Sequence, residues 1–320
     1  MKGAILILLP AAALFMLSLL TPWPALHSLA TQDPALASAV LLELRLPRAM
    51  LALIYGGMLG ASGAAIQGLF ANPLASPDLT GTTSGAALGA VVTAYLFGFA
   101  APIALSIGSV LGALAALVLL LALAGRRAET ATLLLAGLAI SALAGALTTL
   151  ALALAPSPFA FYDAYDWLMG SLVDRSLAQA AFAGVPALAT IALLWRMRAA
   201  LDSLTLGEEV AESLGHDVAR MRVWIVCLTA LGVGACVAVC GAIGFVGLVA
   251  PIFARRLTGG HPGRAILPAA AIGGLLLLAA DLVVRTAPVG RTLPIGVVTA
   301  LLGAPFFLWL VVHMRWRIAR

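Results

Sequence analysis

Apolar runs of about 20 residues recur along the whole chain, and this feature restricts the fold more than any other. A helix of about 20 residues is needed to cross the roughly 30 Å of hydrocarbon in a bilayer. Hydrophobic residues make up 63% of the 320 residues and charged residues 10%, whereas about a quarter of the residues in soluble domains are charged. The sequence therefore predicts an all-α polytopic membrane protein embedded in a lipid bilayer.

We predict ten spans that form one transmembrane domain over residues 1–320. They cover residues 4–22, 46–70, 85–100, 103–124, 131–154, 177–195, 223–241, 242–257, 265–283 and 294–312. With the N-terminus inside, thirteen of the eighteen Lys and Arg residues fall on one side, and five fall on the other. Cytoplasmic loops are enriched in these residues, so both termini are predicted to be cytoplasmic. The net charge of +5 then needs no nucleic-acid partner.

Two stretches interrupt the apolar pattern. The first is "ANPLASPDLTGTTSG" at residues 71–85, whose prolines and glycines prevent one continuous helix. Irregular backbone at a membrane boundary is tolerated where it is buried in protein or lines a cavity. The second is "PSPFAFYDAYDWLMGSLVDRS", which falls on the outer face and places aromatic residues at interface depth. Runs such as "GGMLGASGAAIQG" predict close helix packing through small residues.

The chain lacks the residue patterns of an enzyme or a metal site. Its four histidines lie in loops or at span ends without HExxH spacing. Its three cysteines share one apolar segment, where we expect them to pack as small apolar residues. Asp281 lies four residues before Arg285 near the outer end of a span, which predicts an ion pair along one helix. We therefore expect no catalytic residue, no bound metal and no cofactor.

Lys2 is the only lysine in the chain. A P-loop of the form GxxxxGKS/T needs a lysine that reaches the phosphates, so this chain has no such ATP site. If ATP drives transport, another polypeptide must hydrolyse it.

The segment "LTLGEEVAESLGHDVARMR", residues 204–222, carries six of the 31 charged residues and lies on the predicted cytoplasmic side. Thr205 and Glu208 fit a capping box, which predicts a helix from about Leu206. Gly215 suits the position after its last turn. Leu206, Val210 and Leu214 form an apolar ridge, and the glutamates lie elsewhere. The helix is either solvated against the bundle or gripped by a soluble partner.

Five strings in order carry a family resemblance. They are "LRLPRAMLALIYGGMLGASGAAIQGLFANPLASPDLTGTTSGAALGA", "DWLMGSL", "LGEEVAESLG", "GAIGFVGLVAPIFARRLTGG" and "LPIGVVTALLGAPFFLWL". In these the chain resembles the FecCD family, the permease subunits of type II ABC importers for cobalamin, haem and ferric siderophores. The resemblance implies ten helices and a homodimer in the bacterial inner membrane. It also implies two cytoplasmic ABC ATPase subunits, which use the ATP, and a periplasmic substrate-binding protein.

The resemblance also assigns roles to residues. The ATPase-coupling helix maps onto about 206–215, with Leu206, Gly207, Glu208, Glu209, Val210, Glu212, Leu214 and Gly215. Docking of the binding protein maps onto Arg45 and Arg285, and the cytoplasmic gate onto Asn72, Leu74 and Thr130. The sequence departs from the family pattern at Glu129-Thr130-Ala131, where relatives often have hydroxyl residues.

Gln67 and Ser141 are candidates for lining the pathway, because each is polar within an apolar helix. Hydrogen bonding between helices explains them nearly as well. Overall, the resemblance implies a permease that imports a metal chelate by alternating access, with a ferric siderophore preferred and haem or cobalamin open. The alternative is an ion-coupled secondary transporter, against which the scarcity of intramembrane carboxylates argues.

Overall fold

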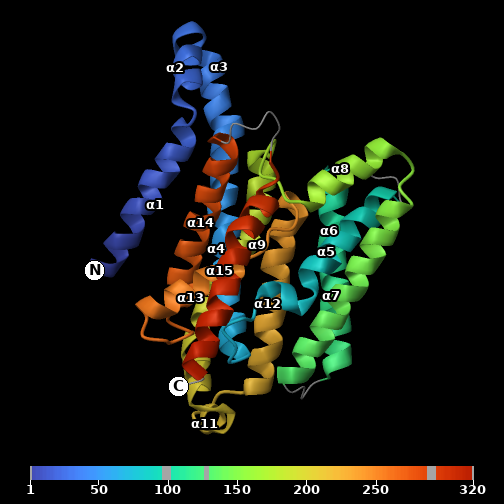
Figure 1. The fold of residues 1–320 in the computed structure, drawn as a ribbon, viewed down its shortest axis with the longest axis vertical. Coiled ribbons are helices and arrows are strands. Elements are labelled where there is room, and N and C mark those ends of the chain that lie inside the picture. Colours follow the sequence, from blue (N-terminus) through green and yellow to red (C-terminus); the bar gives the residue numbers. More distant parts are fainter. Residues whose placement is uncertain (1, 96–101, 126–129, 287–292, 319–320) are drawn as a thin grey trace.

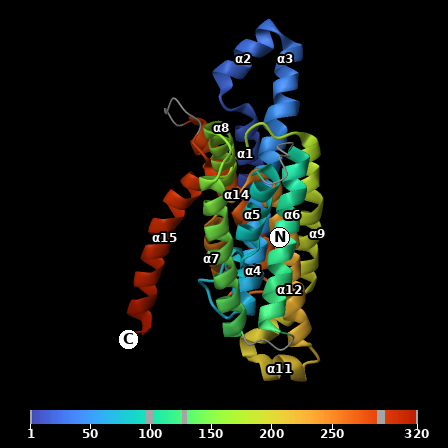
Figure 2. The same ribbon diagram turned by 90° about the vertical axis from the view of Figure 1, so that its right-hand side faces the viewer.

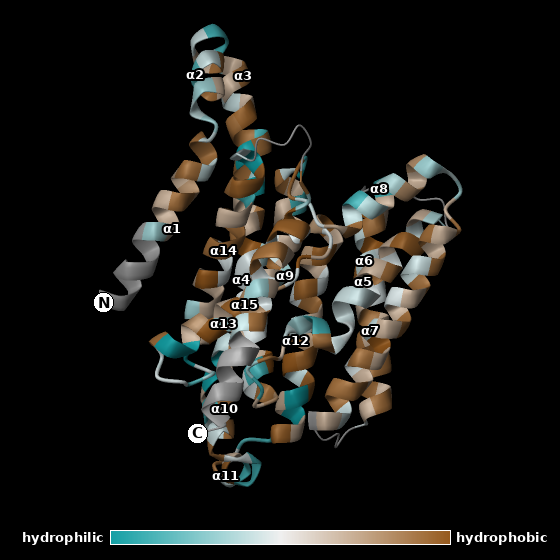
Figure 3. Cartoon of the chain, in the orientation of Figure 1, coloured by the Kyte–Doolittle hydropathy of each residue, from teal (hydrophilic) through white to brown (hydrophobic). Residues whose placement is uncertain are grey.

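The computed structural model describes residues 2–95, 102–125, 130–286 and 293–318, and every regular element in these ranges is helical. Long helices stand side by side in one bundle, with α2, α3 and α8 at one end and α11 at the other (Figures 1 and 2). We call these the α2 end and the α11 end. Hydrophilic residues gather at the two ends, and the middle of the bundle is mostly hydrophobic (Figure 3).

The elements follow one another in this order: α1 Lys2–Leu20, α2 Trp23–Gln32, α3 Pro34–Ala39, the π-helical η1 Val40–Arg45, α4 Leu46–Leu69, the 3-10 turn η2 Pro77–Thr80, α5 Thr82–Tyr95, α6 Pro102–Ala124, α7 Thr130–Ala153, α8 Pro158–Leu168, α9 Leu177–Arg196, α10 Arg198–Ser203, the 3-10 turn η3 Leu204–Leu206, α11 Glu208–Ser213, α12 Val218–Cys240, α13 Val246–Leu257, α14 Ile266–Thr286 and α15 Ile295–Ile318.

Each of the ten predicted spans overlaps a separate helix, although residues 96–100 of the third lie outside the described residues. Within the described chain, six helices are long and apolar enough to cross a membrane. A seventh is added if α1 and α2, which meet at a bend of 56°, form one broken span. The all-helical membrane fold is confirmed, and the count of ten crossings stays a prediction.

Two helices begin at residues other than the approximate span starts that were predicted. The span at 223–241 begins earlier, at Val218, because the Asp217 side chain accepts a hydrogen bond from the Arg220 backbone (2.9 Å) and caps α12. The span at 242–257 begins later, at Val246, because the chain from Gly241 to Phe245 is unwound.

Helix α8 was not predicted as a helix, although Ser157 and Pro158 supply a capping residue and a first-turn proline.

Helix α4 forms the centre of the bundle, and its glycines set how closely its neighbours approach. A Cβ added at Gly56 would lie closer than 3.0 Å to the carbonyl of Gly273 on α14, and one at Gly60 would meet Ala269 in the same way. Hydrophobicity cannot drive helices together in lipid, so small residues that allow backbone contact are used instead. The predicted role of the small-residue run is confirmed.

The unwound step between α12 and α13 is held by a tyrosine from α4. The buried Tyr55 hydroxyl donates to the carbonyl of Gly241 (3.0 Å) and accepts from the backbone N–H of Ile243 (3.3 Å). These contacts replace helical hydrogen bonds that the break removes. Cys236 and Cys240 are buried in the last turns of α12, as expected for packing residues.

Candidate functional site

Helix α11 is shorter than the predicted helix at 206–215. Leu204–Leu206 forms a 3-10 turn, and Gly207 then leaves the helical region with a φ of 103° and a ψ of 156°. The Thr205 hydroxyl donates to the carbonyl of Asp202 (2.7 Å) and does not cap α11. The capping box of Thr205 and Glu208 was therefore a wrong prediction. A glycine is needed at position 207, because other residues rarely adopt this backbone conformation.

The end of α11 agrees with the prediction. Gly215 has a φ of 88°, its N–H donates to the carbonyl of Glu212 (2.9 Å), and the N–H of His216 donates to that of Ala211 (3.1 Å). These two bonds are the Schellman pattern, which satisfies the last carbonyls of a helix. Gly215 therefore ends α11 as the sequence indicated.

The three apolar residues of the predicted ridge are all exposed, but they do not lie on one helix: Val210 is on α11, Leu206 belongs to the 3-10 turn before Gly207, and Leu214 follows the last residue of α11. We call these three residues the apolar ridge. Ala211 is fully buried, whereas Leu206 is 65% exposed, Val210 40% and Leu214 60%. Glu209 and Glu212 are also exposed. Three exposed apolar side chains on one short surface segment are a feature typical of interaction sites.

One of the three predicted glutamates is engaged within the chain. Glu208 forms an ion pair with Arg222 of α12, whose side chain is only 13% exposed. On the other side of the segment, a carboxylate oxygen of Asp202 accepts from the backbone N–H of Gly263 (2.7 Å). Sequence reasoning missed Arg222 as a partner, because its separation from Glu208 by 14 residues matches no helical spacing.

The turn after α4 contains the predicted gate residues. Helix α4 ends at Leu69; Ala71 beyond it has a φ of 47°, and the N–H of Asn72 donates back to the carbonyl of Gln67 (3.2 Å). The Asn72 side chain then accepts from the N–H of Leu74 (2.9 Å), across Pro73. Asn72 thus shapes the turn that leads to η2. Thr130 begins α7, and its side chain lies outside the described residues.

Both pathway candidates make hydrogen bonds between elements. The Ser141 hydroxyl on α7 donates to the carbonyl of Asp78 in η2 (3.2 Å). The buried Gln67 amide donates to the carbonyl of Leu248 on α13 (3.2 Å). These are the contacts that the alternative explanation expected, and a role in lining the pathway stays a prediction for both residues.

At the α2 end, Asp281 joins two arginines. It pairs with Arg285 on the same helix (2.6 Å) and with Arg48 on α4 (2.8 Å), and its own side chain is 1% exposed. The predicted pair along α14 is confirmed, and the contact with Arg48 was not foreseen. We call Arg45, Arg48, Arg285 and Asp281 the arginine cluster. Three arginines and one aspartate give this cluster a net positive charge.

The two predicted docking arginines hold the end of α1. Arg45 donates to the carbonyl of Leu19 and Arg285 to that of Ser18, each at 2.8 Å. The last carbonyls of a helix lack partners within it, and positive charge is favourable there. The Arg285 side chain is 8% exposed. Its contacts in this structure are therefore within the bundle, and little of it is accessible to a partner.

Comparison with known proteins decides the family. The profile of the FecCD transport family matches residues 4–313. The chain belongs to the FecCD transport family. Two relatives are import permeases: the vitamin B12 import system permease protein BtuC of Vibrio cholerae serotype O1, and the Fe(3+) dicitrate transport system permease protein FecD of Escherichia coli strain K12. BtuC is 40% identical, over 92% of this chain and 87% of its own length, and FecD 37%, over 93% and 90%.

A solved structure of a metal-chelate type ABC transporter in an inward-facing conformation matches with a TM-score of 0.83 and 31% identity. The match covers 96% of this chain and 99% of the other. The FecCD chain is therefore a multi-pass membrane protein with an ABC permease fold, and its relatives are transport subunits rather than enzymes.

Proposed function

We propose that this FecCD chain is the permease subunit of an ATP-driven importer that passes a metal chelate from a periplasmic binding protein to the cytoplasm by alternating access. The observation that carries the proposal is α11. The apolar ridge of Leu206, Val210 and Leu214, on and beside α11, is exposed, while Ala211 on the other face of α11 is fully buried. A short helix of this kind suits the cleft of a soluble partner.

The partner proposed for α11 is a cytoplasmic ABC ATPase, with one copy on each permease of a homodimer. Because Lys2 is the only lysine, the chain has no P-loop, and ATP hydrolysis belongs to the ATPase. Glu209 and Glu212 flank the ridge and are free to meet basic side chains of that partner. Replacing Glu208, Glu209 and Glu212 together with Ala is expected to impair ATPase assembly or coupled uptake in a folded permease.

The α11 end is proposed to face the cytoplasm of a bacterium, with the chain in its inner membrane and both termini cytoplasmic. Basic residues near this end support the orientation. Among the described residues they include Arg196, Arg198, Arg220, Arg222, Arg255, Arg256 and Arg264.

The binding protein is proposed to dock at the α2 end through carboxylates that meet the arginine cluster. Arg45 is partly exposed, so it is proposed to contact a carboxylate of the binding protein first. Arg285 is more deeply buried and would be reached after it. An arginine and a carboxylate form a charge-assisted hydrogen bond, which gives both affinity and orientation.

A homodimer with one pathway on its two-fold axis fits the surface of α7. This helix packs on the bundle through a single stripe that includes Leu133, Ile140 and Ala144. Its other faces expose leucines, among them Leu135, Leu138 and Leu143. A second copy placed against these faces would enclose a path lined mainly by small and apolar residues.

For the substrate we propose a ferric siderophore, with cobalamin and haem as the alternatives, since relatives are named for vitamin B12 and for ferric dicitrate.

The test of this function is uptake of each radiolabelled chelate by proteoliposomes that contain permease, ATPase and binding protein. We expect uptake that requires Mg-ATP. Uptake driven by a proton or sodium gradient without ATP would support the ion-coupled alternative.

A further inference from the structure

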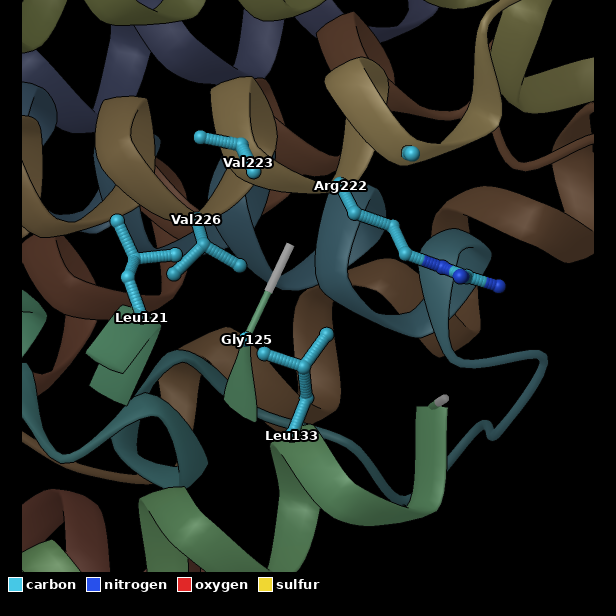
Figure 4. Close-up of a pocket in the computed structure, with 7 residues that line it drawn as sticks. Leu121, Gly125, Leu133, Arg222, Val223 and Val226 are labelled. Carbon is cyan, nitrogen blue, oxygen red and sulfur yellow. The ribbon is translucent and has the colours of Figure 1, made fainter. Parts of the chain in front are cut away.

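Arg222 is placed between the docking helix and the interior of the bundle. Its aliphatic stem lines a small cavity together with Leu121 of α6, Leu133 of α7 and Val226 of α12, and its guanidinium points away from these apolar side chains (Figure 4). The charged end of Arg222 reaches Glu208, the first residue of α11. A long basic side chain can thus bury its stem and still pair at the surface.

The same cavity borders α7, the helix that packs on η2 beyond the gate turn. Leu133, Gly137 and Ser141 are spaced four residues apart, so they lie on one face of α7. A Cβ added at Gly137 would lie closer than 3.0 Å to the carbonyl of Leu79, and Ser141 donates to that of Asp78. Ala75 and Ser76 are the residues between the turn of Asn72 to Leu74 and the start of η2. Packed contacts therefore run from α11 to the start of α12, from there through α6 to α7, and from α7 to η2, which follows the gate turn in the chain.

On this basis we propose that Arg222 is a positioning residue for coupling, which rests on the function proposed above. Its ion pair with Glu208 fixes α11 to the junction of α6, α7 and α12. When the ATPase moves α11, the pair carries that displacement to α7 and so to the gate turn. Coupling between distant sites is carried by such contiguous packed contacts when one element has two arrangements.

The test uses the permease assembled with its ATPase in proteoliposomes, and the probe is a membrane-impermeant maleimide. Cys227→Ser removes the partly exposed native thiol, and Leu74→Cys adds one at the gate turn. The measured quantity is the change in labelling rate of Leu74→Cys on addition of Mg-ATP. The variants are Glu208→Gln, Arg222→Met and the charge swap Glu208→Arg with Arg222→Glu. Arg220→Met is the matched control, since Arg220 pairs with Asp217 in an exposed contact on the same turn of α12.

We expect Glu208→Gln and Arg222→Met to reduce the ATP-driven change about tenfold, within the range typical of coupling between sites, while ATPase binding and hydrolysis persist. The charge swap should restore the change, and Arg220→Met should leave it intact. Glu208 is exposed, so Glu208→Gln tests the pair even if Arg222→Met fails to fold. A full ATP-driven change in both single variants, an equal loss in Arg220→Met, or no recovery in the swap would overturn the inference. Absence of ATPase binding by the parent would instead overturn the proposed function.

Discussion

The α11 end and the α2 end both carry residues that are predicted to contact a partner. At the α11 end these side chains are exposed, whereas at the α2 end they are engaged in contacts within the chain. At the α11 end, Leu206, Val210 and Leu214 are exposed on and beside α11. At the α2 end, Arg45 and Arg285 donate to α1. A partner can therefore cover the α11 ridge without displacing an internal contact. A carboxylate that reaches the arginine cluster must compete with Asp281 and the carbonyls of α1.

The largest effect that separates the two ends is expected for Asp281→Asn. This variant removes the carboxylate from between Arg48 and Arg285 and leaves two largely buried guanidinium groups without their counter-charge. Breaking a buried ion pair in this way costs about 3–5 kcal/mol. Thermal unfolding of the purified permease in detergent measures the loss, with Glu209→Gln as the exposed control. Equal unfolding temperatures for the two variants would contradict the difference between the ends.

A smaller effect is expected for Arg45→Glu, which tests the α2 end as a docking surface. Reversal of this charge should weaken capture of the loaded binding protein about tenfold at low salt, and less at high salt because exposed charges are screened. Surface plasmon resonance with the permease in nanodiscs measures the capture. Arg45→Gln keeps a donor for the Leu19 carbonyl and is the matched control for the position of α1. Undiminished capture by Arg45→Glu would remove Arg45 from the docking surface.

The smallest effect is expected for Glu209→Gln with Glu212→Gln at the α11 end. Both side chains are exposed, so each contact with a partner contributes roughly 0–1 kcal/mol. ATPase affinity should fall a few-fold and depend on salt, and the unfolding temperature should not change. A loss of binding as large as that caused by changes to the ridge would mean that charge, rather than apolar contact, dominates the interface.

The long helices could be predicted closely from sequence. The predicted span at 46–70 appears as Leu46–Leu69, and that at 103–124 as Pro102–Ala124. An apolar run of this length has few alternatives, because a backbone in lipid must satisfy its hydrogen bonds internally. The location of α11 and its terminal glycine were also predictable, since both depend on local signals.

Contacts set by tertiary packing could not be predicted. Arg48 and Asp281 are 233 residues apart, and no local pattern joins them. The start of α11 was misplaced because the Thr205 hydroxyl bonds to Asp202 and Gly207 turns the chain first. The exposure of individual side chains could not be predicted from the sequence either. In the structure the charged Arg285 is buried, whereas the apolar Leu206, Val210 and Leu214 are exposed.

The most direct test of the central claim is the affinity of the ABC ATPase for Val210→Asp with Leu214→Asp, measured with the permease in nanodiscs. Both side chains are exposed, so the variant should fold and unfold at the parent temperature. Apolar residues at the centre of an interface carry much of its binding energy. The account predicts loss of ATPase binding by at least roughly a hundredfold, which is about 2.7 kcal/mol. Binding equal to that of the parent would contradict the assignment of α11 as the docking helix.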